Sequence, residues 1–275
     1  MCRWGRPNNA ILSYLSAGQK AKHPSITSMG IIKIEQLRRD FQVGDEVVHA
    51  LRGVDFEVER GEFVSIMGTS GSGKSTLLNI LGCLDSPTSG RYTIGGTDVS
   101  KLSTDELAEI RNRRIGFVFQ SYNLLPRTST LENVELPLLY NRRYSASQRR
   151  EKAMEAIRRV GLESRVNHTS AQLSGGQQQR VAIARAIVTD PVIVLADEAT
   201  GNLDTRTSYE IMSLFQQLHA GGATIVFVTH EPDIAAFTTR TIKMRDGMIV
   251  EDKAVEPLSA DERLASLPTL ENTMP

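Results

Sequence analysis

Eight residues decide the fold of this chain: Gly68-Thr69-Ser70-Gly71-Ser72-Gly73-Lys74-Ser75. They match the pattern G-x-x-x-x-G-K-[ST] and stand between a strand-like run, Glu62 to Met67, and a helical run from Thr76 onward. Glycines let the backbone fold around phosphate oxygens, and the N-terminus of the following helix adds partial positive charge. Lys74 is expected to reach the β- and γ-phosphates and Ser75 to ligate Mg²⁺. The stretch therefore predicts a nucleoside triphosphate site in an α/β fold.

A second stretch carries two acids at the end of an apolar strand. Val192 to Ala196 is the strand-like run, and Asp197 and Glu198 follow it directly. Ligands of open α/β sheets bind at the carboxyl ends of the strands. Asp197 can hold Mg²⁺ through water, and Glu198 is the candidate to orient or deprotonate an attacking water. Taken alone, the two acids also fit an acidic helix cap; Lys74 upstream favours the metal and water roles.

A third stretch, Leu173-Ser174-Gly175-Gly176-Gln177, precedes an apolar-periodic helix and predicts a second anion-binding helix N-terminus. One nucleotide needs two such cradles only if they face it from opposite sides. A symmetric pair of chains provides this arrangement, because each chain gives its Lys74 loop to one ATP and its Ser174 helix end to the other. An incidental helix cap is the alternative.

Two further polar residues follow strand-like runs. Gln120 comes after Ile115 to Phe119, and His230 comes after Thr224 to Thr229. Both are expected at the sheet edge that holds Asp197, where Gln120 could touch Mg²⁺ or water and His230 the γ-phosphate. For an isolated Gln or His, a surface residue with satisfied hydrogen bonds is the commoner outcome.

Composition excludes several classes of protein. The chain has 275 residues, 40% of them apolar and 23% charged, as in ordinary globular proteins. Its 32 basic and 32 acidic residues sum to a formal charge of zero, which does not indicate a nucleic-acid binder. Cys2 and Cys83 form neither a disulfide framework nor a zinc motif, which favours a reducing, cytoplasmic setting. No apolar run approaches the roughly 20 residues of a membrane span.

The chain divides into three parts. Residues 1–28 contain no acid and predict a disordered N-terminal extension, or a segment upstream of a start at Met29. Residues 29–252 form the main domain. Residues 253–275 are polar with three prolines and are expected to be loosely ordered.

Within the main domain, the pattern predicts both sheets and helices. Alternating apolar positions in 31–58 and the turn signals Gly95-Gly96 and Asp246-Gly247 imply a small antiparallel sheet. Short apolar runs with helices between them predict a mostly parallel sheet. Capping-box patterns begin at Ser103, Ser129 and Ser145, and they predict a helical insert at about residues 121–175.

Together these motifs resemble the ATPase domain of ABC transporters over about residues 31–252. The runs Asn79 to Asp85, Pro87 to Gly90 and Asn123 to Pro126 are similar to the ATPase subunits of the lipoprotein-releasing and macrolide-exporting group. The resemblance implies a P-loop NTPase core that hydrolyses ATP with Mg²⁺. It also implies a head-to-tail homodimer that powers an integral-membrane permease from the cytoplasmic face of the inner membrane, with no nucleic acid bound.

The resemblance assigns roles residue by residue. Gln120 is implied as the sensor, Glu198 as the catalytic base and His230 as the switch histidine; Asp204 is a dimer contact. The full expected site consists of the catalytic Lys74, Gln120, Glu198 and His230; the nucleotide-binding Phe41, Gly68, Thr69, Ser70, Gly71, Ser72, Gly73, Lys74, Ser75, Thr76, Ser174, Gly175, Gly176 and Gln177; and the metal-binding Ser75, Gln120 and Asp197.

Two positions depart from the family pattern. Ala199 stands where proline usually follows the base, and Phe41 stands where a tyrosine usually stacks on adenine. Stacking needs only a ring face, so Phe41 is expected to serve, although it could be an ordinary apolar residue at a strand end. Activity is expected to survive both changes.

An apolar groove for the permease is also expected from the resemblance. Its candidate residues are Tyr122, Leu124, Leu125, Pro126, Leu138, Leu139 and Tyr140, most of which also suit the core of the helical insert. The nearby cluster of Arg142, Arg143, Arg149 and Arg150 predicts a solvated helix face, or a contact with anionic lipid head groups.

Other functions remain as alternatives. A soluble ABC ATPase that acts on nucleic acid or the ribosome usually carries a long coiled coil or two tandem ATPase domains, and this chain shows one phosphate loop and no sustained heptads. A regulatory module without turnover conflicts with Lys74, Asp197 and Glu198. A kinase or small GTPase does not explain Leu173 to Gln177.

Overall fold

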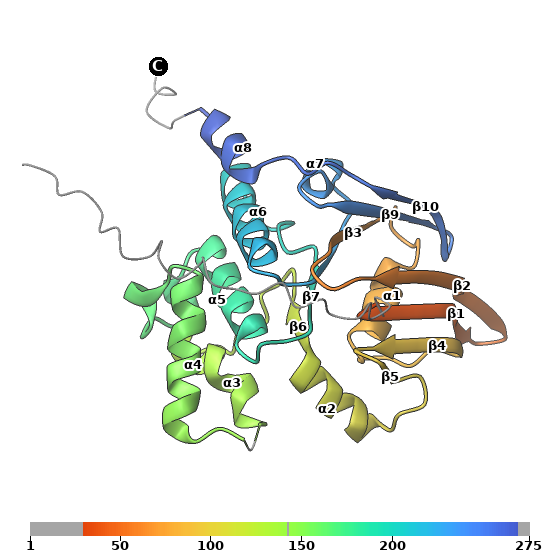
Figure 1. The fold of residues 1–275 in the computed structure, drawn as a ribbon, viewed down its shortest axis with the longest axis horizontal. Coiled ribbons are helices and arrows are strands. Elements are labelled where there is room, and N and C mark those ends of the chain that lie inside the picture. The colour runs from red at the N-terminus through yellow and green to blue at the C-terminus, as the bar shows by residue number, and fades with distance from the viewer. Residues whose placement is uncertain (1–29, 142, 269–275) are drawn as a thin grey trace, which may run out of the picture.

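The computed structural model describes residues 30–141 and 143–268. The predicted extension at residues 1–28 lies outside these ranges. A six-stranded sheet runs through the middle of the domain in the order β10-β9-β3-β8-β7-β6, and all neighbours except β10 are parallel (Figure 1). The strands are β3 (Phe63–Met67), β6 (Ile115–Val118), β7 (Ile193–Asp197), β8 (Ile225–Thr229), β9 (Arg240–Arg245) and β10 (Met248–Ala254).

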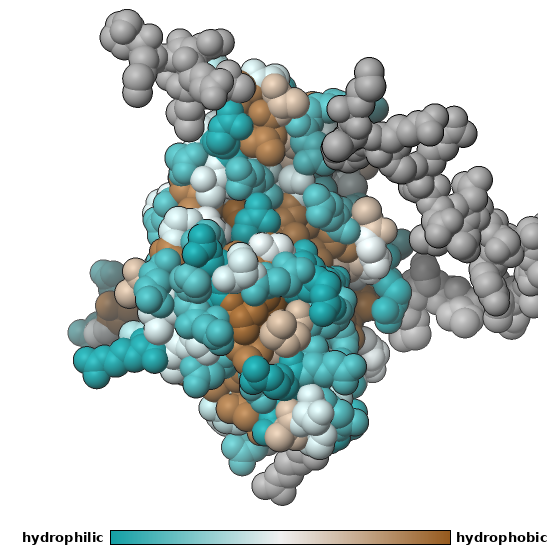
Figure 2. Space-filling model, turned by 90° about the vertical axis from the view of Figure 1, so that its left-hand side faces the viewer, coloured by the Kyte–Doolittle hydropathy of each residue, from teal (hydrophilic) through white to brown (hydrophobic). Residues whose placement is uncertain are grey.

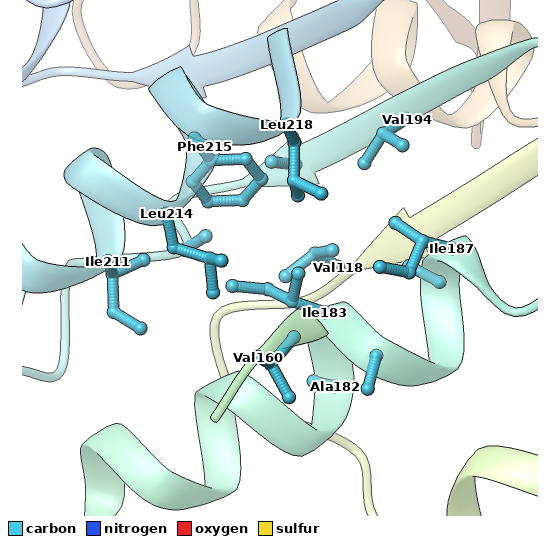
Figure 3. Close-up of a cluster of buried hydrophobic side chains, with 14 of the residues drawn as sticks. Val118, Val160, Ala182, Ile183, Ile187, Val194, Ile211, Leu214, Phe215 and Leu218 are labelled. Carbon is cyan, nitrogen blue, oxygen red and sulfur yellow. The ribbon is translucent and has the colours of Figure 1, made fainter. Parts of the chain in front are cut away.

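The central strands are buried on both faces because their residues are apolar almost without interruption. In β8, Phe227 faces one core cluster and Val226 the other. The first cluster packs α5 (Gly175–Ile187) and α6 (Thr205–Ala220) on the sheet, with Ile183 of α5 and Leu214 of α6 pointing toward each other (Figure 3). The second cluster packs α1 (Lys74–Leu81) and a smaller sheet on the opposite face.

The smaller sheet is antiparallel and has four strands in the order β2-β1-β4-β5. They are β1 (Ile32–Val43), β2 (Glu46–Val58), β4 (Ser89–Ile94) and β5 (Thr97–Asp98). The Gly95-Gly96 turn joins β4 to β5 as predicted. The Asp246-Gly247 turn joins β9 to β10 and thus belongs to the six-stranded sheet, because β9 pairs with β3 rather than with the small sheet.

The helical insert gathers to one side of the sheets (Figure 1). It contains α3 (Thr130–Leu139), α4 (Ala146–Arg159) and the 3₁₀ turns Glu163–Arg165 and Ser170–Gln172, and it leads into α5. The serines expected to begin helices do so: Ser103 caps α2 (Thr104–Arg114), Ser129 caps α3 and Ser145 caps α4, each in a capping box. Local sequence therefore sets where these helices start.

Residues 253–268 are packed on the domain, which corrects the expectation of a loosely ordered tail for this part. Helix α8 (Ala260–Ser266) lies along α6, and Ala260 is fully buried. Gln216 of α6 donates to the carbonyl of Leu258 and accepts from the N–H of Ala260. The hydroxyl of Ser213 donates to Asp261 at 2.6 Å. Polar side chains of α6 thus satisfy the backbone of a segment that is itself polar.

The face of the molecule on the side of α4 and α5 is mostly hydrophilic, with hydrophobic areas between the hydrophilic residues (Figure 2). The helices described for residues 30–141 and 143–268 include none with the length and apolar character that crossing a membrane requires.

Candidate active site

A cavity of about 1360 Å³ opens beyond the carboxyl end of β3. The loop between β3 and α1 forms its floor, and the ends of β7 and β8 supply Glu198 and His230. Every residue from Gly68 to Thr76 lines it. The structure therefore brings the phosphate loop, which contains Lys74, together with two of the three other predicted catalytic residues, as parallel neighbouring strands require.

Glycine is required at two points of this loop. Gly73 has φ +98°, and a Cβ there would come within 2.7 Å of the carbonyl oxygen of Ala50. A Cβ at Gly68 would lie 2.5 Å from the carbonyl oxygen of Met244. Gly73 is the N-cap of α1 and offers no side-chain cap, so the first N–H groups of that helix remain directed at the cavity end.

Lys74 is 8% exposed, and its ammonium folds back on the loop. Nζ donates to the carbonyl oxygens of Gly68 at 2.7 Å and Thr69 at 3.0 Å. Ser75, the predicted Mg²⁺ ligand, is exposed at the first turn of α1. The loop thus presents a cation, a hydroxyl and backbone N–H groups to one space, which is the donor set that a triphosphate needs.

The two acids at the end of β7 differ in surroundings. Burial raises the pKa of Asp197, the negative charge of Glu198 raises it further, and Lys74 opposes the rise. Glu198 has φ +43°, a strained backbone for a residue with a side chain, and its Oε1 lies 2.8 Å from Nδ1 of His230. His230 is more than half exposed. A carboxylate held in this way can accept a proton from water while the imidazole keeps the carboxylate in its orientation.

Gln120 follows β6 as predicted, although it does not line the cavity. A Cβ at Gly201 would lie 2.9 Å from its Nε2, and its backbone carbonyl accepts from Asn202. The side chain therefore contacts the loop that follows Glu198. Its predicted contact with Mg²⁺ or water stays a prediction.

The predicted second cradle lies apart from the cavity, and none of Ser174 to Gln177 lines it. Ser174 caps α5, whose N-terminus adjoins the N-terminus of α6, since a Cβ at Gly176 would meet Thr207. Asp204 caps α6, and bonds from the hydroxyl and N–H of Thr207 lower its pKa. Ser174 and Asp204 therefore share one surface, distinct from the Lys74 loop.

Phe41 is also absent from the cavity lining. Its ring packs against the guanidinium of Arg39, 4.5 Å from the ring centre, and 36% of the residue is exposed. Its partner across the sheet, Val48, does line the cavity. Phe41 thus stands at the margin of the cavity, and the base contact predicted for it stays a prediction.

Sequence reasoning missed one wall of the cavity. Gly247, in the turn between β9 and β10, donates from its N–H to the carbonyl of Ser72 and accepts from the N–H of Arg52. The Asp-Gly turn signal was visible, but its place beside the phosphate loop depends on β9 pairing with β3. The missed lining residues are Val48, His49, Ala50, Arg52, Met67, Lys243, Met244, Arg245, Asp246, Gly247 and Val250.

A second cavity of about 940 Å³ lies between α2, β6 and α3. Of the seven residues predicted for an apolar groove, Tyr140 lines it; Tyr122 and Leu124 pack on the core instead, and Leu138 is buried. Leu125 and Leu139 are exposed. The other apolar and aromatic lining residues are Leu84, Ala108, Ile115, Phe117, Phe119, Leu136, Pro137 and Ala186.

The predicted arginine cluster is only partly assembled. Arg143 lines the second cavity, whereas Arg149 pairs with Glu135 at 3.2 Å. Arg150 is exposed on α4, and Arg142 lies outside the described residues.

Comparison with known proteins identifies the family. The model of the ABC transporter family matches residues 51–201. The chain belongs to this family and is an ABC-type ATPase. It is 52% identical to the ABC transporter ATP-binding protein YknY of Bacillus subtilis, an alignment that covers 80% of this chain and 95% of that protein.

A longer relative and a solved structure are also similar to this chain. The macrolide export ATP-binding/permease protein MacB of Chlorobium phaeobacteroides is 52% identical over 81% of this chain, which spans 34% of that longer protein. The ATP-binding cassette MJ0796, described as a dimer in a post-hydrolysis state bound to ADP and Pi, has 45% identity and a TM-score of 0.75 over 82% of this chain and 100% of its own. This ABC ATPase is thus similar in fold to a nucleotide-binding dimer.

Proposed function

We propose that two copies of this ABC ATPase bind two Mg-ATP head to tail and that hydrolysis drives an export permease. One observation carries the proposal: the Lys74 loop and the Ser174 helix end lie on separate surfaces of one chain. Both are helix N-termini suited to phosphate. A second copy is the simplest means by which both can face one nucleotide.

Within each copy, the cavity residues fit the triphosphate. Lys74 and the N–H groups of the loop would hold the phosphates, and the oxygens of Ser75, which lines the cavity, and of Asp197, which senses the charge of Lys74 from outside the lining, would hold Mg²⁺. Oxygen donors are the ligands that this ion prefers. When bound, the ion neutralises charge that develops on the phosphates.

Glu198 would act on the water that attacks the γ-phosphate. Its carboxylate projects into the cavity and is oriented by His230 at 2.8 Å. His230 would keep the carboxylate in place and sense the γ-phosphate. In-line attack leaves little covalent chemistry to the protein, so positioning provides most of the acceleration.

The permease would dock at the second cavity. Its apolar lining and its cations Arg111, Arg113, Arg143 and Arg185 suit an amphipathic cytoplasmic segment. Fusion of the ATPase to a permease in MacB supports a permease partner, and the macrolide export in the name of that relative supports export of a drug; lipoprotein extrusion is the other cargo class that we propose. The ATPase would then lie on the cytoplasmic face of the membrane, and it would follow the membrane fraction only when its permease is co-expressed.

The variant Glu198→Gln tests the catalytic part. Turnover should fall on the order of 100-fold or more, since a general base is lost while ATP binding persists. With ATP present, this variant should accumulate as a dimer in size-exclusion chromatography with light scattering. A variant that turns over ATP normally would reject Glu198 as the base.

A matched pair of variants tests the composite site. Ser174→Arg in the Glu198→Gln background should bind ATP but remain monomeric. Ser145→Arg in the same background is the control, because Ser145 caps α4 through the same type of capping box, with Gln148 in the role of Gln177. Equal dimerisation of the two variants would exclude Ser174 from the interface.

A further inference from the structure

Arg39 joins two parts of the molecule that flank the cavity. Its guanidinium makes a two-pronged bond with Asp85: Nε to Oδ2 at 2.9 Å and Nη2 to Oδ1 at 2.8 Å. Both side chains are about three-quarters buried. Such paired bonds fix the plane of a guanidinium, so Arg39 has one defined orientation.

Asp85 itself is anchored to the helix that begins at the phosphate loop. Its N–H and that of Leu84 both donate to the carbonyl of Asn79 in α1. On the other side, β1 is tied to the same segment, because the N–H of Asp40 donates to the hydroxyl of Thr88. The end of α1 therefore holds the β1–β2 hairpin in a fixed place.

The ring of Phe41 rests on this fixed guanidinium. The 4.5 Å separation is that of a cation–π contact, and it covers one face of the ring. Phe41 is 36% exposed, and its cross-strand partner Val48 lines the cavity, so the uncovered ring face lies at the margin of the cavity, outside its lining. A planar base could stack on that face.

We propose that Arg39, held by Asp85, is a positioning residue that braces Phe41 so that the free face of its ring receives the adenine. The inference rests on the proposed function, in which ATP occupies the cavity. Bracing lowers the conformational entropy that the ring loses when a base stacks on it. We call Arg39, Asp85 and Phe41 the base brace.

Binding of ADP measured by isothermal titration calorimetry tests the brace, since one chain provides the whole contact. Arg39→Ala and Asp85→Asn should each weaken ADP binding about twofold to fivefold, the range of an exposed cation–π contact. Arg91→Ala is the matched control, because Arg91 pairs with Asp98 in the same sheet and lies on β4 opposite Glu35, six residues before Phe41 along β1. It should leave ADP binding unchanged.

Inorganic tripolyphosphate separates bracing from damage to the phosphate loop. It has no base, so Arg39→Ala should not alter its affinity. If Arg39→Ala weakens the binding of tripolyphosphate and of ADP equally, the pair of Arg39 and Asp85 acts on the phosphate loop through α1. If Arg39→Ala binds ADP more tightly, Arg39 keeps the ring away from the base. Either result overturns the brace.

Phe41→Ala distinguishes the brace from the contact on which it depends. Loss of the ring should weaken ADP binding about tenfold, and Arg39→Ala should then add nothing. If Phe41→Ala has no effect, the proposed base contact fails. If Phe41→Ala weakens binding and Arg39→Ala does not, the contact stands and the brace fails.

Discussion

The N-termini of α1 and α5 look alike in sequence and differ in structure. Serine and glycine residues lie at both N-termini, before the first residue of α1 and on both sides of the first residue of α5. The α1 end has Gly73 at the N-cap and no side-chain cap, so its N–H groups remain available to a ligand. At α5, the hydroxyl of Ser174 accepts from the N–H of Gln177, and the amide oxygen of Gln177 accepts from the N–H of Ser174.

Because of this difference, the two helix N-termini are suited to different contacts with a nucleotide. A helix end without a cap has unsatisfied donors that gain fully from a phosphate, whereas a capped end has already satisfied two of them. The α1 end is therefore suited to first capture within one chain. The α5 end is suited to the later contact that the proposed dimer would make.

The largest difference between the two helix N-termini is expected when the cation at the start of α1 is removed. Lys74→Ala should weaken ADP binding about 100-fold, because hydrogen bonds between charged groups are lost. Ser174→Ala should leave the same affinity unchanged, as that end does not face the cavity of its own chain. Calorimetry on both variants decides the point, and comparable losses would show that the two ends act together within one chain.

The next effect concerns the backbone of the α1 end. Gly73→Ala should lower the free energy of unfolding by about 2–3 kcal/mol, since a side chain at φ +98° is strained and would meet the carbonyl of Ala50. Gly71→Ala is the control: it has φ +78° but no neighbour within 4 Å, so it should lose about 1 kcal/mol. Urea titration of both variants measures the difference, and equal losses would leave no role for the contact.

A smaller effect is expected at the cap of α5. Ser174→Ala should reduce the free energy of unfolding by about 1 kcal/mol, the usual contribution of a serine N-cap. Ser145→Ala, which removes the N-cap of α4, should reduce the free energy of unfolding by a similar amount. A Ser174 variant as stable as the parent would indicate that the capping box contributes nothing there, and the contrast with α1 would weaken.

The smallest effect is pH-dependent. Burial and Glu198 raise the pKa of Asp197 above its usual value near 3.8, so its ionised form is disfavoured in the folded chain. Asp197→Asn should therefore stabilise the nucleotide-free chain at pH 7, by less than about 1 kcal/mol because solvent screens the site. The gain should vanish as the pH falls below 3.8, where the carboxyl is protonated in both states.

Asp204 provides the control, because its replacement should change the free energy of unfolding in the opposite direction. Bonds from Thr207 lower the pKa of Asp204, so its ionised form stabilises the folded chain above the usual pKa. Asp204→Asn should cost stability at pH 7 and cost less as the pH falls. Denaturation at several pH values measures both, and parallel pH profiles would contradict the assigned surroundings.

Local features of the fold could be predicted from the sequence because they depend on near neighbours. The strand before Gly68 and the caps at Ser103, Ser129 and Ser145 lie where the residue patterns place them. Carboxyl-end placement of Glu198 and His230 followed from strand order in parallel sheets.

Features that depend on distant partners were not predictable. The packing of residues 253–268 depends on Ser213 and Gln216, some forty residues earlier. The ring of Phe41 packs on Arg39, which pairs with Asp85 in the loop between α1 and β4. These pairings cannot be predicted from composition, because a polar side chain can form hydrogen bonds either with water or with a specific partner in the protein.

The ammonium of Lys74 is already coordinated by the carbonyls of Gly68 and Thr69. An ammonium has three N–H donors, so two of them hold the loop and the third stays available to an arriving phosphate. The same two bonds preserve the curvature of the loop after ADP departs. In the proposed cycle, each turnover would therefore begin with a loop that is already curved for phosphate.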